Sequence, residues 1–235
     1  MSFNLMRNYI QNNHTKNIMN YKAAIFDMDG LLLDTEQVCM TAFQQTCTEM
    51  DIPFKQDIYL SIIGRNQAGI KPIIEKGYGD LLDYSVFHPR WMQRYLAVVE
   101  HQAIPVKSGI IALLEWLQSQ NIPMVVATST HNVLAHKKLQ LAGLAHYFSH
   151  ITSGDEVING KPAPEIYLLA AQRLHISPEQ CLAFEDSNNG VKSAIAANMT
   201  VLQIIDLVEP DTDTRALGHH IFNTMDEALT FLKAV

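Results

Sequence analysis

The 235-residue sequence predicts an α/β protein, with a doubly wound, Rossmann-like parallel sheet as its core and a small inserted α-helical cap domain. Three observations predict this fold. Short apolar runs end in polar or acidic residues, amphipathic helical patterns separate those runs, and about seventy residues after the first run show helical patterns without a convincing strand. Strands that alternate with helices are typical of a parallel sheet covered by helices.

Four apolar runs are the expected strands. None of them alternates apolar and polar residues regularly, which is typical of strands that are buried on both faces. The runs are Ala23–Phe26, Pro123–Ala127, Cys181–Phe184 and Thr200–Ile205.

Three helical patterns lie between these runs. Ser108 is the expected N-cap of a helix that continues to about Asn121, with an apolar stripe on one side. Pro164 suits the first turn of a second helix, because proline lacks the N–H that the first turn leaves unbonded. The third helix is expected from about Asn189 to Ala197.

The segment 36–105 does not fit the alternation of strands and helices. Helical patterns are clear in Val38–Met50 and Tyr84–Glu100, and a structureless loop of this length would be unusual. We therefore expect an inserted helical cap at 36–105, between two parts of an α/β catalytic core at 20–35 and 106–235. Residues 1–19, rich in asparagine and free of acidic residues, are expected to be a flexible extension.

Composition excludes several classes of protein. With 48% hydrophobic residues the chain can form a core, and it lacks an apolar run of the ~18–20 residues that cross a bilayer. The net charge of −7 disfavours binding to nucleic acid, which depends on clustered basic residues. The three cysteines and ten histidines show no metal or redox spacing, so we expect reduced thiols and a cytoplasmic protein.

Polar side chains follow three of the expected strands. Asp27 and Asp29 follow the first, Thr128 and Ser129 the second, and Glu185 and Asp186 the third. A single aspartate at such a position commonly caps a helix or forms a turn. Because ligands of open α/β sheets bind beyond the carboxyl ends of the strands, the coincidence of three polar strand ends indicates a shared site.

The four carboxylates of this group would repel one another if they lie close together. Each pair costs about 4 kcal/mol at about 4 Å with an effective dielectric constant of about 20. Either some carboxyl groups are protonated or a cation lies among them. Because the donor set consists of oxygen atoms alone, a hard cation is favoured, and Mg²⁺ is the expected cofactor.

Lys161 lies in the stretch Gly160–Pro164, where two prolines restrict the backbone. A lone lysine is usually a solvated surface charge, but a lysine held beside carboxylates could balance an anionic substrate. Together with Thr128, Ser129 and the amides that open a helix at about His131, it is expected to form an anion-binding cradle.

Four stretches, taken together and in this order, resemble the motifs of the haloacid dehalogenase superfamily. Phe26–Glu36 resembles the first motif, Ala127–Ser129 the second, Lys161–Glu165 the third and Glu185–Gly190 the fourth. The resemblance covers about residues 20–206. The insertion between the first two motifs resembles the α-helical cap of the branch that contains β-phosphoglucomutase, sugar-phosphate phosphatases and pseudouridine-5′-phosphatase.

The resemblance implies phosphoryl transfer through an aspartyl-phosphate. Asp27 would be the nucleophile and Asp29 the general acid and base. Mg²⁺ would be held by Asp27, the Asp29 carbonyl, Asp186 and Glu185, and the phosphate by Thr128, the Ser129 amide and Lys161. Elementary electrostatics agrees, because a carboxylate can attack a phosphate dianion only where cations reduce the repulsion.

The expected function is Mg²⁺-dependent hydrolysis of a small phosphorylated metabolite, a sugar phosphate or a nucleoside monophosphate, by a monomer. Cys39 stands where the phosphoglucomutase has a cap histidine, which disfavours mutase activity, and Asp29 disfavours dehalogenation. Phosphotransfer, phosphonate cleavage and a non-catalytic phosphate-binding module stay open as alternatives. Gly64–Gln67 is a candidate for substrate specificity, or an ordinary polar turn.

Overall fold

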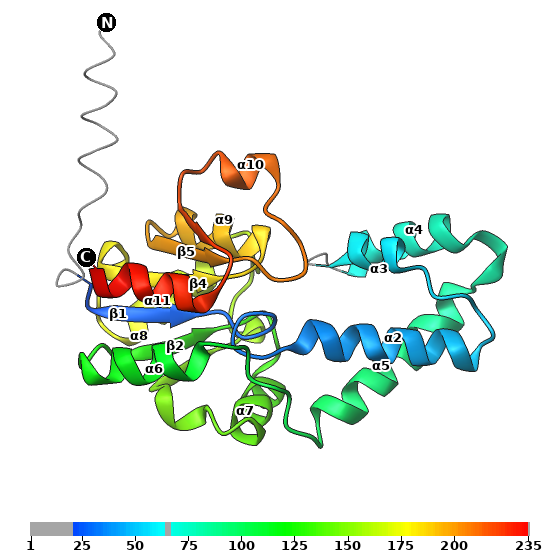
Figure 1. Ribbon diagram of the computed structural model, residues 1–235, viewed down its shortest axis with the longest axis horizontal. Coiled ribbons are helices and arrows are strands. Elements are labelled where there is room, and N and C mark those ends of the chain that lie inside the picture. Colours follow the sequence, from blue (N-terminus) through cyan, green and yellow to red (C-terminus); the bar gives the residue numbers. More distant parts are fainter. Residues whose placement is uncertain (1–20, 64–66, 235) are drawn as a thin grey trace, which may run out of the picture.

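A parallel sheet of six strands forms the centre of the computed structural model, which describes residues 21–63 and 67–234 (Figure 1). The strand order is β3-β2-β1-β4-β5-β6, and all neighbouring strands are parallel. This arrangement confirms the predicted fold class. The strands are β1 (Ala23–Phe26), β2 (Met124–Ala127), β3 (His150–Thr152), β4 (Cys181–Glu185), β5 (Thr200–Ile204) and β6 (His220–Phe222).

Helices cover both faces of the sheet. Strand β1 is therefore buried on both faces, which explains why its residues do not alternate between apolar and polar. Ala24 and Phe26 pack in one buried cluster with side chains of α6, α7 and α11, whereas Ala23 and Ile25 pack in another with side chains of α8 and α9. Both faces of β1 are therefore apolar. The helices are α6 (Ile110–Ser119), α7 (Asn132–Leu141), α8 (Glu165–Arg173), α9 (Asn188–Ala196), α10 (Thr212–Arg215) and α11 (Met225–Ala234), and the short 3-10 helices are η3 (Ala145–Tyr147), η4 (Gly154–Glu156) and η5 (Pro178–Gln180).

Some expectations about single elements were wrong. The N-cap of α6 is Gly109 and not Ser108, because the backbone there has φ of 79°, a left-handed conformation that glycine adopts without strain. Pro164 is the N-cap of α8 and so lies just before its first turn. Strands β3 and β6 were not expected from the sequence, since each has only three residues and lies at an edge of the sheet.

Four α-helices of the described residues lie between β1 and α6 and extend away from the sheet (Figure 1). They are α2 (Thr35–Glu49), α3 (Gln56–Ile62), α4 (Gln67–Tyr78) and α5 (Tyr84–Val99), with the 3-10 helix η2 (Gly79–Leu81) before α5. These helices have a buried cluster of their own, in which the ring of Phe43 contacts Tyr59, Phe87 and Trp91. The described part of 36–105 contains no strand, as expected.

The expected N-terminal extension, residues 1–19, lies outside the described residues, as do Gly64, Arg65 and Asn66 of the candidate specificity segment. Among the described residues, no helix is both long and apolar enough to cross a bilayer.

Candidate active site

The carboxyl ends of three adjacent strands, β2, β1 and β4, carry six of the seven predicted site residues, and Lys161 lies in the segment between η4 and α8. Asp27 follows β1 directly, and its backbone N–H donates to the Phe184 carbonyl at 3.0 Å. A cleft of about 660 Å³ opens here, and six of the seven predicted residues line it. They are Asp27, Asp29, Thr128, Ser129, Lys161 and Asp186.

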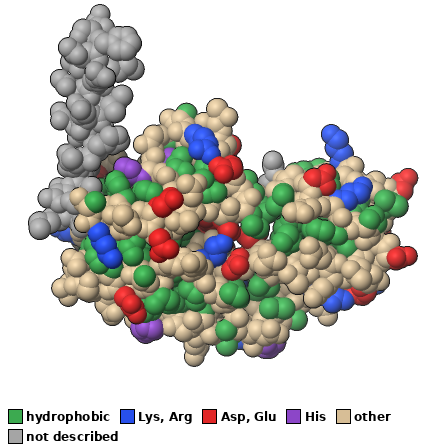
Figure 2. All heavy atoms as spheres, viewed as in Figure 1, with side chains coloured by type: hydrophobic (Ala, Val, Ile, Leu, Met, Phe, Trp, Pro, Cys, Tyr) green, Lys and Arg blue, Asp and Glu red, His purple; other side chains and the backbone are tan. Residues whose placement is uncertain are grey.

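The seventh residue, Glu185, is fully buried at the end of β4. The cleft is also lined by Leu60 and Ile63, which belong to the helical segment inserted after β1. Charged side chains gather where this segment meets the sheet-containing part of the molecule (Figure 2).

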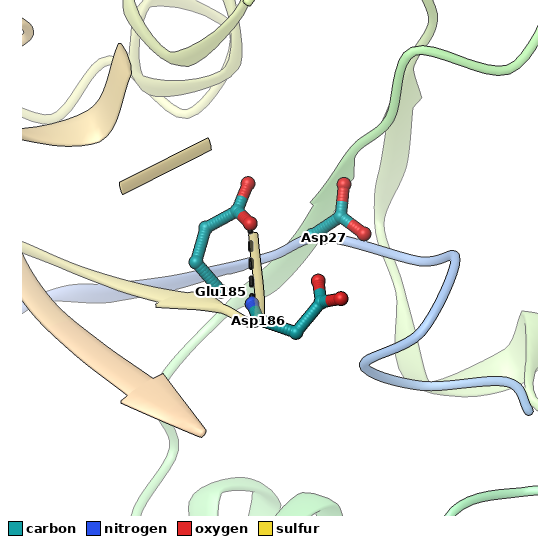
Figure 3. Close-up of side chains that lie close together, drawn as sticks. All are labelled: Asp27, Glu185 and Asp186. Atoms are coloured by element: carbon teal, nitrogen blue, oxygen red, sulfur yellow. Dashed lines mark hydrogen bonds between the residues drawn. The ribbon is translucent and has the colours of Figure 1, made fainter. Parts of the chain in front are cut away.

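Three carboxylates approach one another at the carboxyl ends of β1 and β4. One oxygen from each of Asp27, Glu185 and Asp186 lies within 4.8 Å of the others, and Figure 3 shows these groups together at the ends of β1 and β4. The Asp186 Oδ1 atom is buried and has no hydrogen-bond partner among the described residues. Because a buried acceptor without a partner is costly, and because carboxylate oxygens are the donors that hard cations prefer, this group fits a divalent cation.

Glu185 is held by donors on both carboxylate oxygens. Its Oε1 accepts from Lys161 Nζ and from the Tyr167 hydroxyl, each at 2.6 Å. Its Oε2 accepts from the backbone N–H of Asp186 at 3.2 Å, and from the N–H and Oγ of Ser187 at 3.3 and 3.2 Å. Glu185 therefore adds negative charge at a fixed position.

Lys161 joins the ends of β1, β2 and β4 through a single ammonium group. Its Nζ donates to Asp27 Oδ1 at 2.5 Å and to the Ala127 carbonyl at 3.0 Å, in addition to Glu185. Burial alone would lower the pKa of Lys161, but the charges of Asp27 and Glu185 outweigh it and raise the pKa above its ordinary value. The amine is therefore charged.

The pKa of Asp27 is raised to about 7. Burial is the largest cause, the negative charges of Glu185 and Asp29 add to it, and Lys161 acts in the opposite direction. The pKa of Asp186 is also raised, first by burial and then by Asp27 and Glu185. A cation among these groups would offset both effects.

Asp29 has partners that the sequence analysis missed. Its Oδ1 accepts from Lys138 Nζ at 2.7 Å, and its Oδ2 accepts from the hydroxyls of Thr130 at 2.6 Å and Thr128 at 3.4 Å. Burial would raise the pKa of Asp29, but Lys138 and the hydrogen bond from the Thr130 hydroxyl lower it below its ordinary value. The one available signal for Lys138 was its position on the inward face of α7, three residues after Ala135.

Further acidic residues of the cleft were also missed, among them Glu36 and Asp206. Glu36, in the first turn of α2, lines the cleft, and its pKa is raised to about 7 by burial and by the charges of Asp29 and Asp206. Asp206 follows β5 and accepts a hydrogen bond from Lys107. The sequence did not predict Glu36 or Asp206 as site residues, because neither lies at the ends of the three strands that carry the predicted site residues.

The anion cradle expected at the start of α7 is only partly available. His131 is the N-cap of this helix, and the backbone N–H of Asn132 donates to Asp155 Oδ1 at 2.8 Å. The N–H of Thr130 donates to Thr128 Oγ1 at 3.1 Å. These two amides therefore already have partners within the protein.

Comparisons with known proteins support this description. The sequence profile of the family described as "Haloacid dehalogenase-like hydrolase" matches residues 24–204. The "Phosphorylated carbohydrates phosphatase" of Thermotoga maritima is 33% identical over 217 residues, covering 91% of this chain and 99% of that protein. The "Fructose-1-phosphate phosphatase" of Escherichia coli is 30% identical, with 78% and 96% coverage.

A solved structure of a "HAD family hydrolase" from Deinococcus radiodurans, with bound phosphate and sodium, has the same overall fold. The two chains superpose with a TM-score of 0.78 at 25% sequence identity, covering 92% of this chain and 98% of that one.

Proposed function

We propose that this chain, which belongs to the haloacid dehalogenase-like hydrolase family and is a phosphoric monoester hydrolase, acts on a small phosphorylated metabolite. The reaction proceeds through an aspartyl-phosphate, with Mg²⁺ as cofactor. The proposed substrates are sugar phosphates and nucleoside monophosphates. The names of the two relatives favour the sugar phosphates. The observation that carries the proposal is that Lys161 joins Asp27 and Glu185 beside Asp186 at the wall of one cleft.

In the first step, Asp27 attacks phosphorus, and the bond between phosphorus and the leaving oxygen breaks. To donate a proton to the departing alkoxide, Asp29 must first take up that proton against the effect of Lys138, which lowers its pKa. In the second step, the ionised Asp29 accepts a proton from water as that water attacks the aspartyl-phosphate, which releases inorganic phosphate and restores the Asp27 carboxylate.

Positive charge must balance the phosphate dianion beside Asp27. Lys161 supplies one charge, and Thr128 and the Ser129 amide are the proposed phosphate donors. Asp27, Asp186, the Asp29 carbonyl and Glu185 would hold Mg²⁺, which supplies further positive charge against the phosphate oxygens when it is bound.

We further propose that 36–105 is a cap, placed to exclude water from the cleft and to contact the leaving group. Leu60 and Ile63 of this segment line the cleft. The described helices of the segment pack around their own buried cluster, as an inserted domain would. Monomeric state, cytoplasmic location and the lack of nucleic-acid binding stay predictions of the sequence.

The nucleophile is tested by Asp27→Asn with p-nitrophenyl phosphate and Mg²⁺. We expect the variant to lose turnover by roughly a thousandfold or more while keeping its circular dichroism spectrum, because an amide cannot form the acyl phosphate. Asp80→Asn, at an exposed position in η2, is the matched control and should retain wild-type turnover. Undiminished hydrolysis by Asp27→Asn would refute the proposed nucleophile.

The substrate class is tested by phosphate release from a panel of sugar monophosphates and nucleoside monophosphates. We expect one of these two groups to be hydrolysed with the higher kcat/KM. Equal and slow hydrolysis of both groups would contradict the proposal that either is the substrate class.

A further inference from the structure

Lys138 is a buried cation that the proposed chemistry does not use directly. It belongs to α7, and its side chain is 1% exposed. Its neighbours on the inward face of the helix are Ala135 and Leu139, which both pack in the apolar core. An ammonium group in such surroundings is costly unless a partner compensates its charge, and an apolar side chain of similar length would fill the space at lower cost.

The partner of Lys138 is Asp29. The distance from Lys138 Nζ to Asp29 Oδ1 is 2.7 Å, and this is the single salt bridge found for Lys138 in the described part of the chain. The opposite oxygen of Asp29 accepts from the Thr130 hydroxyl at 2.6 Å. Because each oxygen has a donor from a different residue, the plane of the carboxylate cannot turn without losing one of these bonds.

Lys138 also connects this carboxylate to the inserted helices. Its Nζ donates to the hydroxyl of Tyr95 in α5 at 3.0 Å, and it lies 5.4 Å from the centre of the Tyr95 ring. Tyr95 packs against the apolar cluster of the core and also against the cluster of the inserted helices. The three groups therefore link α5, α7 and the segment after β1.

We propose that Lys138 is a positioning residue for the reaction, which fixes the Asp29 carboxylate at the wall of the cleft and, through Tyr95, links that position to helix α5. This inference rests on the proposed function, because it assigns to Asp29 the transfer of protons. Lys138 itself does not line the cleft. It acts through Asp29, and not by contact with the substrate.

A double-mutant cycle between Lys138 and Asp29 tests the inference. The variants are Lys138→Met, Asp29→Asn and the double variant, with kcat and KM measured for p-nitrophenyl phosphate, whose leaving group departs without a proton donor. We expect Lys138→Met to lower kcat by roughly 10- to 100-fold, with KM changed by less than about threefold. In the Asp29→Asn background the same substitution should change kcat by less than about twofold, because the group that it positions is already absent.

Three further variants separate positioning from general stability. Lys137→Met, at the adjacent and more exposed lysine, is the matched control and should leave kcat unchanged. Lys138→Arg keeps the charge and should recover part of kcat. Tyr95→Phe removes the hydroxyl and should lower kcat less than Lys138→Met does, again without effect in the Asp29→Asn background.

The outcomes distinguish this inference from the proposed function. If the wild-type enzyme hydrolyses phosphomonoesters but Lys138→Met and Asp29→Asn have additive effects on kcat, the inference is wrong and the proposed function stands. The same holds if Lys138→Met changes KM alone. If Lys138→Met shows no cooperative thermal transition, the cycle between Tyr95→Phe and Asp29→Asn is used instead. Additive effects of these two substitutions on kcat would then show that the inference is wrong. A wild-type protein without phosphatase activity would refute both.

Discussion

At Gly190 the absence of a side chain decides the geometry of the site. A Cβ atom at this position would lie 1.9 Å from Cδ and Oε1 of Glu185, so any larger residue must displace the carboxyl group. The Gly190 N–H donates to Ser187 Oγ at 3.0 Å, which starts helix α9 directly against Glu185. The absence of a side chain at Gly190 therefore permits the approach of Glu185 to Lys161.

We predict that Gly190→Ala destabilises the protein by about 1–3 kcal/mol through overpacking. It should also lower kcat by roughly a hundredfold, because the displaced Glu185 would release Lys161 from its position beside Asp27. Urea denaturation and p-nitrophenyl phosphate turnover measure the two effects. Gly160→Ala is the control, since a Cβ atom there meets nothing within 4 Å, and equal behaviour of the two variants would contradict the argument.

Glu156 illustrates how a single ion pair contributes to stability. It completes a capping box with Ser153, and its carboxylate accepts from Arg173 Nη2 at 2.6 Å. The hydrogen bond from Arg173 is the main cause that lowers the pKa of Glu156 to about 2, with help from Ser153 and against the effect of burial. The charged form is therefore favoured in the folded protein.

We predict that Glu156→Gln lowers the free energy of unfolding by about 1 kcal/mol at pH 7. A lowered pKa contributes stability above the ordinary value of 4.5, and this contribution is lost as the pH falls toward 2. The difference between the variant and the wild type should therefore shrink between these pH values. Thermal melts across that range measure it, with Glu75→Gln, at an exposed position in α4, as control. A difference that grows on acidification would be inconsistent with the linkage.

Among the elements, α2 and α5 depend on one aromatic side chain. Phe43 of α2 is fully buried, and its ring centre lies 4.8 Å from that of Phe87 and 5.0 Å from that of Trp91, both in α5. Tyr59 of α3 lies 5.3 Å away, in an edge-to-face arrangement. Phe43 thus joins three of the inserted helices.

We predict that Phe43→Ala destabilises these helices by about 3–5 kcal/mol, because it leaves a cavity that the rigid aromatic neighbours cannot fill. In a Trp116→Phe background, where Trp91 is the remaining tryptophan, the fluorescence of Trp91 should report a transition at lower urea concentration than without Phe43→Ala. Ile111→Ala, at a partly exposed position on α6, is the control and should change stability by less than about 0.5 kcal/mol. A shift no larger than that of the control would show that the cluster is not structurally important.

The elements differ in how far the sequence predicted them. The central strands were found because their apolar runs are local and contiguous, and β1 needs apolar residues on both faces. Strands β3 and β6 have three residues each, with partly exposed positions, so their pairing with β2 and β5 and not their composition makes them strands. The N-cap of α6 at Gly109 depends on a left-handed backbone conformation that the expected capping pattern does not reveal.

In the molecule as a whole, acidic groups from distant parts of the chain meet in one cleft. Bringing Asp27, Glu185 and Asp186 together costs repulsion and desolvation, which raise the pKa of Asp27 and Asp186 in the folded protein. A divalent cation that binds only to the folded state would relieve both costs and therefore stabilise the fold.

We predict that EDTA abolishes phosphatase activity and that Mg²⁺ restores it. Independently of activity, Mg²⁺ should raise the melting temperature, since a ligand at about 100 times its Kd stabilises the folded state by about 2.7 kcal/mol. Asp186→Asn should reduce this shift, whereas Asp80→Asn should not. Metal-independent turnover, or an equal shift in Asp186→Asn, would refute the cation site.

The sequence by itself determined the fold class, the four central strands and the order of the motifs, because these depend on local patterns of apolar and polar residues. It also pointed to Asp27, Glu185 and Asp186 as neighbours, since carboxyl ends of adjacent parallel strands meet at one edge. The roles of these residues stay predictions until the variants are measured.

Only the tertiary structure decided which side chains complete the site. Lys138 is separated from Asp29 by 109 residues, and its position on the inward face of α7 is the one local feature that distinguishes it from the neighbouring Lys137. Glu36 enters the cleft because α2 begins beside it. Such contacts arise from the packing of whole elements, in which a charge that is costly to bury is accepted where a partner from another element compensates it.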